Sequence, residues 1–142
     1  MSLSELFERT ELLDRAPTIE GVVRFGGPVS QEQVWLVYPS GVLPAELEGQ
    51  VQVAPGITAS ASRKVLELIG NGQVPHGLIT LMGYAGWAPG QLENEIRMGS
   101  WLPTDVNAAI VFDTAPGELW ARAYERVGAS PMAFTTRTVG SA

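Results

Sequence analysis

The stretch from Gly83 to Glu93 constrains the fold more than any other part of the chain. The apolar run before it, residues 78–82, is typical of a buried strand, and Pro89 is typical of the start of a helix over 90–98. The glycines in between let the backbone come close to another part of the protein or to a ligand. If Gly86 has a positive φ, Gly86→Val is expected to destabilise the fold by about 1–3 kcal/mol.

The composition predicts one ordinary domain with a packed core. The chain has 142 residues, of which 45% are hydrophobic and 17% charged. This balance argues against disorder. There is no cysteine, no segment resembling a signal peptide, and no apolar run long enough to span a bilayer. We therefore expect a soluble, cytoplasmic protein with no membrane partner, folded over residues 1–128 and followed by a loose tail over 129–142.

The charge of the chain argues against direct binding to nucleic acid. The net charge is −6, and only Arg63 and Lys64 are adjacent among nine basic residues. Proteins that follow a phosphate backbone draw their affinity from clustered lysine and arginine side chains. A DNA-binding role would also need a basic recognition helix, and no predicted helix has that character.

The first third of the chain predicts one helix and two strands. Ser2 and Glu5 have the spacing of a capping box, which indicates a helix over residues 2–15. Short strands are expected over 21–25 and 34–38. Because only eight residues separate them, the simplest arrangement is a hairpin or a wide β-connection.

From Val51 onward, strands and helices alternate. A strand is expected over 51–58, interrupted at Pro55-Gly56, followed by a helix over 63–69 with Ser62 as its N-cap and Gly70 as its stop. The strand and helix around the glycine stretch come next, and Gly99 is expected to end that helix. The last two elements are a strand over 108–112 and a helix over 117–127 with Trp120 in the core. This alternation favours parallel strands joined by right-handed crossovers. Together with the earlier strands it predicts a mixed sheet.

If the crossovers are right, the carboxyl ends of the strands share one edge, which is where open α/β sheets place ligands. The predicted ligand-binding residues are Ser62, Gly83, Tyr84, Gly86, Trp87, Gly90, Gln91 and Asp113. Helices that begin at this edge would suit a small anion. The alternative is a tight structural turn, with Arg63 paired to Glu67 at i, i+4.

Several of these residues also have a structural interpretation. Trp87 could line a pocket or a contact surface, or it could cover the helix that follows it. Gln91 shares a helix face with Glu95 and could reach a partner or cap the preceding loop. Asp113 is interpreted as an Asx-type cap of the last helix rather than as a catalytic acid.

The sequence contains no catalytic motif, metal site or cofactor fingerprint. His76, the only histidine, lies just before the central strand, roughly 20 Å from the glycine turn if seven strand residues separate them. It therefore cannot act as a base for a nucleophile at that turn, and zinc would find too few good ligands. The glycine spacing matches neither G-x-G-x-x-G nor a phosphate-binding GK[ST] loop.

Five segments together resemble the bacterial AlgH/YqgE family. They are Arg24-Phe25-Gly26-Gly27-Pro28-Val29, Ser62-Arg63-Lys64-Val65-Leu66-Glu67, the block from Gly83 to Ile96, Ser100-Trp101-Leu102 and Val111-Phe112-Asp113. Their order and spacing match from about Val22 to Gly128. The resemblance implies a compact α+β fold with about four helices, in which a curled mixed sheet forms a pseudo-barrel. The family has been labelled a transcriptional regulator through a link to alginate control, and it supplies no catalytic residues.

The chain departs from the family pattern at its amino terminus. Family members usually begin with a further segment of two strands, which is missing ahead of the helix that matches Leu3 to Leu13. The loss of two strands would expose a sheet edge, which a second copy could cover in a homodimer or by strand exchange.

These observations favour a non-enzymatic binding module for a protein partner or a small anionic ligand. The alternatives are a transcriptional regulator acting directly or indirectly, and an enzyme whose site lies at the carboxyl ends of the strands. For an enzyme, the only candidate groups are Asp113, Thr58 and Tyr84.

Overall fold

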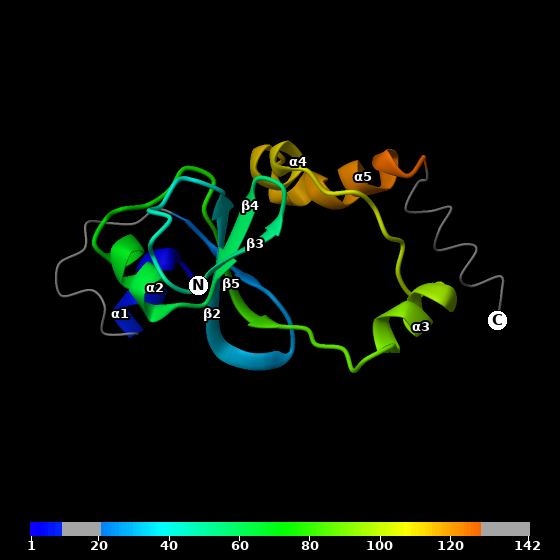
Figure 1. Cartoon of the computed structure of the whole chain (residues 1–142), viewed down its shortest axis with the longest axis horizontal. Helices are drawn as coiled ribbons and strands as arrows, with labels where there is room; N and C mark the ends of the chain where they lie inside the picture. The colour runs from blue at the N-terminus through cyan, green and yellow to red at the C-terminus, as the bar shows by residue number, and fades with distance from the viewer. Residues whose placement is uncertain (10–20, 129–142) are drawn as a thin grey trace. The chain divides into compact units, whose positions relative to one another are not determined.

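Five strands form one open, mixed sheet in the order β1-β5-β2-β4-β3 (Figure 1). The structure is a computed structural model, which describes residues 1–9 and 21–128. The strands are β1 (Val23–Phe25), β2 (Val29–Pro39), β3 (Gln50–Ala54), β4 (Ile57–Ser60) and β5 (Ile79–Tyr84). The helices are α1 (Leu3–Arg9), α2 (Arg63–Gly70), α3 (Gln91–Arg97), α4 (Ala108–Asp113) and α5 (Pro116–Arg126).

The central strands explain why the sheet is mixed. β5 pairs parallel with β1 and antiparallel with β2, and β2 pairs antiparallel with β4. β4 and β5 therefore run in the same direction with β2 between them, and α2 makes the crossover from one to the other. The expected α+β class, mixed sheet and βαβ crossover are confirmed. β1 and β3 are at opposite ends of the strand order, so the sheet is not closed into a barrel.

Two details of the sheet differ from the sequence-based expectation. β1 and β2 do not pair with each other, because β5 lies between them. The segment 51–58 is a hairpin rather than one interrupted strand, since β3 pairs antiparallel with β4. Pro55 fixes φ and Gly56 adopts a φ of 76°, which together reverse the chain between Ala54 and Ile57.

The hydrophobic core lies between α1, α2 and one face of the sheet (Figure 1). Its buried members are Leu3, Leu6 and Phe7 of α1, Leu36 and Tyr38 of β2, Leu43, and Val65 and Ile69 of α2. Leu36 and Tyr38 are two apart, so both point to the same side of β2. The capping box is present: the Ser2 amide donates to Glu5 Oε2 at 2.6 Å, and the Glu5 amide donates to Ser2 Oγ at 3.2 Å. Residues 10–15 of the expected helix and the expected tail over 129–142 lie outside the described residues.

The expected strand over 108–112 is wrong, because these residues form α4. The cause is Asn107, whose side-chain Oδ1 accepts the Ile110 amide at 2.8 Å and so caps a helix. A run of five apolar residues fits a buried strand and a short helix equally well. The second βαβ crossover that depended on this strand therefore does not exist.

Two residues at helix ends and one core residue also differ from expectation. α2 does not stop at Gly70; Asn71 is its C-cap and Gly72, with a φ of 90°, follows in the left-handed region. Asp113 does not cap the last helix, because it ends α4, and Ala115 precedes Pro116 as the N-cap of α5. Trp120 is not in the core, since 64% of it is exposed. Gly99 and Gly128 do follow their helices with positive φ, as expected.

The chain divides into two compact units, Met1–Ala85 and Gly86–Ala142. The first holds the sheet, α1 and α2, and the second holds α3, α4 and α5. The expectation of one domain over residues 1–128 stays a prediction. None of the helices in residues 1–9 and 21–128 has the length and apolar character that crossing a membrane requires.

Candidate functional site

Gly83 lies where two stretches of backbone meet without room for a side chain. It has a φ of 75°, and a Cβ atom built on it would overlap the Gly27 carbonyl oxygen. The converse also holds, because a Cβ on Gly26 would overlap the Gly83 carbonyl and one on Gly27 would overlap the Tyr84 carbonyl. The Gly26 amide also donates to the Met82 carbonyl at 2.8 Å. A glycine is therefore required at position 83 because another part of the protein backbone comes close to it.

The other two glycines of the stretch differ from each other. Gly90 has a φ of 78° and is the N-cap of α3, with open space where a Cβ would stand. Gly86 is not among the residues with positive φ, so the condition attached to the Gly86→Val prediction is not met.

Trp87, Glu95 and Trp101 form a hydrogen-bonded cluster around α3. The indole Nε1 atoms of Trp87 and Trp101 both donate to Glu95 Oε2, at 3.1 Å and 2.7 Å. The two rings meet edge to face, with centroids 5.9 Å apart and an interplanar angle of 76°. Trp87 thus covers the helix that follows it, which was one of its two interpretations. We call Trp87 and Trp101 the tryptophan pair.

Gln91 completes this cluster and caps the turn before α3. Its Oε1 accepts the Ala88 amide at 3.0 Å, and its Nε2 donates to Glu95 Oε1 at 2.9 Å. Both oxygens of Glu95 therefore accept hydrogen bonds. The bonds from Trp101, Gln91 and Trp87 lower the pKa of the Glu95 carboxyl, so this group stays negatively charged well below neutral pH.

The two parallel strands of the first unit, β4 and β5, do not end at the same level of the sheet. Ser60, which ends β4, and Thr80, near the start of β5, both pair with Leu36. β5 runs four residues further to Tyr84, so the carboxyl ends of these strands are staggered by roughly 13 Å.

Ser62, Tyr84 and Asp113 occupy different elements. Ser62 is the N-cap of α2 but its side chain makes no capping hydrogen bond. Tyr84, which ends β5, packs edge to face against Trp35 with centroids 6.3 Å apart. Asp113 ends a helix in the second unit. A ligand at any of the eight predicted residues stays a prediction.

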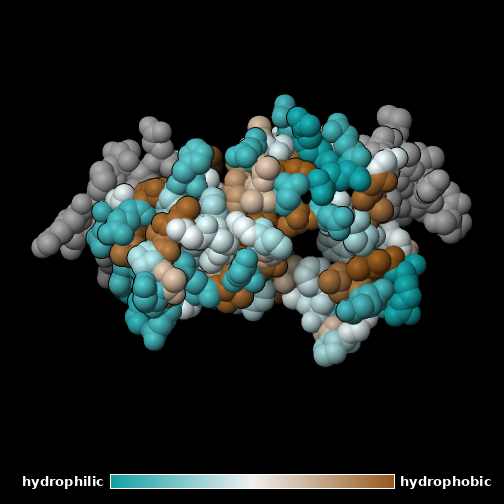
Figure 2. All heavy atoms as spheres, turned by 45° about the horizontal axis from the view of Figure 1, so that its top comes forward, coloured by the Kyte–Doolittle hydropathy of each residue, from teal (hydrophilic) through white to brown (hydrophobic). Residues whose placement is uncertain are grey.

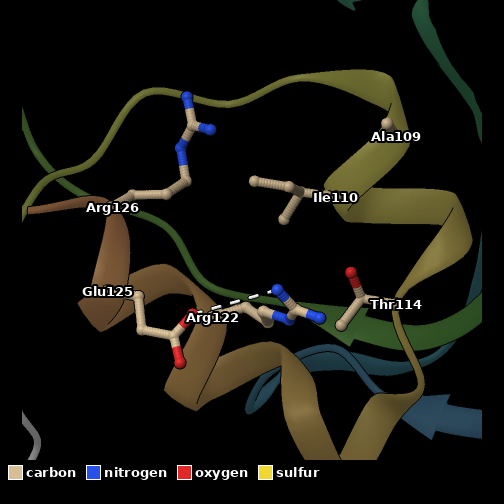
Figure 3. Close-up of a pocket in the computed structure, with 6 residues that line it drawn as sticks. All are labelled: Ala109, Ile110, Thr114, Arg122, Glu125 and Arg126. Atoms are coloured by element: carbon tan, nitrogen blue, oxygen red, sulfur yellow. Dashed lines mark ion pairs between the residues drawn. The ribbon is translucent and has the colours of Figure 1, made fainter.

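A cavity between α4 and α5 carries two arginines that the sequence reasoning did not single out. Its volume is about 410 Å³, and it is lined by Ala109, Ile110, Thr114, Arg122, Glu125 and Arg126 (Figure 3). Arg122 Nη1 lies 3.9 Å from Glu125 Oε2, and Arg126 Nε donates to the Asp105 carbonyl at 3.0 Å. The i, i+4 spacing of Arg122 and Arg126 on α5 was the signal available in the sequence.

His76 lies in a turn before β5, as expected. The Leu78 amide donates to the Pro75 carbonyl at 3.3 Å, and Gly77 has a φ of 80°. The turn borders a second cavity of about 450 Å³, which His76 shares with apolar residues and Thr80. Within the described residues, no three side chains of the metal-binding types converge.

The fold and these clusters define an α+β domain with an open five-stranded sheet, followed by a helical unit with exposed aromatic residues. The sequence matches the AlgH-like family over residues 1–132. The chain belongs to the AlgH-like family, as the sequence motifs indicated.

Known relatives support this assignment. A UPF0301 protein of Anaeromyxobacter sp. (strain K) is 36% identical over 129 residues, which are 91% of this chain and 64% of that protein. The solution structure of the AlgH protein from Pseudomonas aeruginosa is similar with a TM-score of 0.72 and 30% identity, covering 95% of this chain and 70% of the other. A crystal structure from Corynebacterium diphtheriae has a TM-score of 0.63 over 94% of this chain and 68% of the other; at 23% identity it supports the fold alone.

The chain spans only about 64% of the length of the Anaeromyxobacter relative. The names of these relatives specify no activity, ligand or partner. The function of the family is not established, and any role for this chain has to be argued from its own surfaces.

Proposed function

We propose that this protein is a binding module that recognises a basic segment of a protein partner through the tryptophan pair. The observation that carries the proposal is a pair of exposed but immobilised aromatic rings beside a fixed negative charge. Trp87 and Trp101 are 39% and 49% exposed, although both indole N–H groups are hydrogen-bonded to Glu95. Tryptophan is among the residues most enriched at the energetic centres of protein interfaces.

Immobilised side chains favour binding because less conformational entropy is lost when the complex forms. The hydrogen bonds from both rings and from Gln91 hold this cluster in place before any partner arrives. The neighbouring Met98, which is 74% exposed, adds apolar surface at the end of α3. Figure 2 shows hydrophobic residues reaching the surface among polar ones, and the tryptophan pair is distinguished from them by its hydrogen bonding.

The charge of the cluster selects the chemistry of the partner. Glu95 is ionised at neutral pH, and the chain carries a net charge of −6. An arginine or lysine of the partner would gain an ion pair with Glu95 and a cation–π contact with an indole face. The overall negative charge would also attract a basic partner over longer distances.

Affinity capture from a lysate of the source organism tests this proposal, with Trp101→Ala and Glu95→Gln as variants. The matched control is Trp120→Ala, because Trp120 is a tryptophan of the same unit that is even more exposed and lies outside the cluster. We expect the wild type and Trp120→Ala to retain the same basic protein. Trp101→Ala should lose it, and Glu95→Gln should weaken binding at low salt. Retention of that protein by Trp101→Ala, with its helix content unchanged, would refute the proposal.

The cavity between α4 and α5 favours a second candidate function, the binding of a small anion such as phosphate or a carboxylate. Figure 3 shows the Arg122 guanidinium group between Glu125 and Thr114, while Ile110 faces Arg126 across the cavity. Within the described part of the chain, Arg126 donates from Nε to the Asp105 carbonyl, so its terminal nitrogens can serve a ligand. Calorimetric titration with inorganic phosphate tests this function. Arg126→Gln should abolish the binding heat, and Arg63→Gln, an exposed arginine of the other unit, should leave it unchanged.

A further inference from the structure

The two edges of the sheet are protected to very different degrees. β1 is three residues long and carries Arg24, and its outer side is partly occupied by the first residues of the chain. The Leu3 amide donates to the Gly21 carbonyl, and the Val23 amide donates to the Met1 carbonyl, both at 3.1 Å. Shortness, a charge and a covering segment are the usual means by which proteins prevent an edge strand from pairing with another chain.

β3, at the opposite edge, has none of these protections. It is five residues long and contains no charged residue and no proline. Val51 and Val53 are 59% and 58% exposed. No strand of residues 1–9 or 21–128 pairs with its outer side, so a row of backbone donors and acceptors is available there.

This edge is also rigid at the end where the strand begins. Gln50 donates through Nε2 to the carbonyls of Pro44 and Leu47, at 2.8 Å and 3.0 Å, and its Oε1 accepts the Tyr38 hydroxyl at 2.9 Å. Ser60 Oγ donates to the Gly49 carbonyl at 2.7 Å. A strand that is already ordered loses little entropy when a further strand is added.

The sequence of β3 indicates what fits this edge. We propose that it pairs antiparallel with β3 of a second copy of this chain, about a twofold axis at Gln52. Val51-Gln52-Val53 reads the same in both directions, so this register places each valine opposite a valine of the other copy. Glu48, the nearest carboxylate, falls opposite the Pro55-Gly56 turn of the second copy rather than opposite another carboxylate.

The dimer formed in this way is weak and strengthens with salt. A single added strand buries an area at the small end of specific interfaces. Each copy carries a net charge of −6, and the repulsion between two such chains decreases when salt screens it. A dimer held by ion pairs would respond to salt in the opposite direction.

Single cysteine variants test both the dimer and its register, because the natural chain has no cysteine. In the proposed pairing, the Cα atoms of residue 52 in the two copies are about 4.5–5.5 Å apart, which a disulfide spans. Residue 51 of one copy is diagonal to residue 51 of the other, at roughly 7–8 Å, which is too far. Gln52→Cys is the test variant and Val51→Cys its matched control; both positions are exposed.

After mild oxidation, we expect Gln52→Cys to form a covalent dimer at least several-fold faster than Val51→Cys. A mixture of Val51→Cys and Val53→Cys should cross-link faster than either alone, since these residues lie opposite each other. Adding Val53→Lys to Gln52→Cys should abolish the cross-link, and the wild type should sediment as a dimer only at high concentration. Equal cross-linking at positions 51 and 52, a monomer at every concentration, or cross-linking of Gln52→Cys only to a different protein would overturn the proposal.

Discussion

The two units of the chain are stabilised by different means. Among the described residues, the first unit contains nearly all of the buried hydrophobic ones, most of them gathered under one face of its sheet. In the second unit, Tyr124 is the one buried hydrophobic residue among those described, and α3 and α4 have no buried residue. Instead, its helices are fixed by polar contacts, such as the bonds to Glu95 and the Asn107 cap. Substitutions of the same kind should therefore have unequal effects in the two units.

The largest difference is expected from truncating an aromatic side chain in each unit. Phe7→Ala removes a fully buried ring and should lower the free energy of unfolding by about 3–5 kcal/mol. Trp120→Ala removes a larger but exposed ring and should change it by less than about 0.5 kcal/mol. Urea denaturation followed by circular dichroism measures both. Equal losses would show that Trp120 is buried in solution.

A pair of glycines with nearly the same backbone conformation sharpens the comparison. Gly83 and Gly90 have φ values of 75° and 78°, but only Gly83 has neighbouring backbone where a Cβ would stand. Gly90→Ala should cost about 1–2 kcal/mol from the left-handed conformation alone. Gly83→Ala adds a steric overlap and should cost about 2–5 kcal/mol. Thermal unfolding of the two variants measures the difference, and a Gly83→Ala variant as stable as Gly90→Ala would contradict the close approach.

Substitutions at two helix caps should change the stability less, and here the larger loss is expected in the second unit. Asn107→Ala removes the hydrogen bond that caps α4 in the second unit, and should cost about 1 kcal/mol. Ser62→Ala changes the N-cap of α2 in the first unit, where the side chain makes no capping bond, and should cost less than about 0.5 kcal/mol. Hydrogen exchange of the amides in α4 and α2 reports each cap separately. A larger loss at Ser62 would contradict this order.

The smallest effect on stability is expected from the exposed carboxyl of Glu95, and it depends on pH. The pKa of Glu95 is lowered in the folded protein, so its ionised carboxyl stabilises the fold above the usual pKa of a glutamate. This stabilisation is lost as the pH falls through the lowered pKa. The indole N–H signals of Trp87 and Trp101 should shift together in this acidic range in an NMR titration. Glu95→Gln should remove the transition and Glu93→Gln should not. Signals that move independently would argue against a shared acceptor.

Much of the fold could be predicted from local sequence patterns. The capping box, the strands around Val23 and Leu36 and the glycine that ends α3 all depend on neighbouring residues, which the sequence displays directly. The insertion of β5 between β1 and β2 could not be predicted, because strand order depends on long-range pairing. α4 was misassigned since the five apolar residues were considered without the Asn107 cap that precedes them.

The candidate site was predicted less well than the fold. A structural role for Trp87 and Gln91 was one of the alternatives that the sequence indicated, and their hydrogen bonds agree with it. It did not indicate that Trp101 shares the same acceptor, because the distance between these residues depends on the turn after α3. The predicted common edge required aligned strand ends, whereas the register of β2 with its two neighbours staggers them.

The hydrogen bonds of Met1 and Leu3 along the β1 edge have a practical consequence for labelling. A tag or fluorophore attached to the amino terminus would sit at the sheet itself and compete with these bonds. The turn at Gly41 and Val42 is exposed, and no atom lies near the position of a Cβ on Gly41. A short peptide tag inserted there would leave both sheet edges, and with them any assembly of copies, undisturbed.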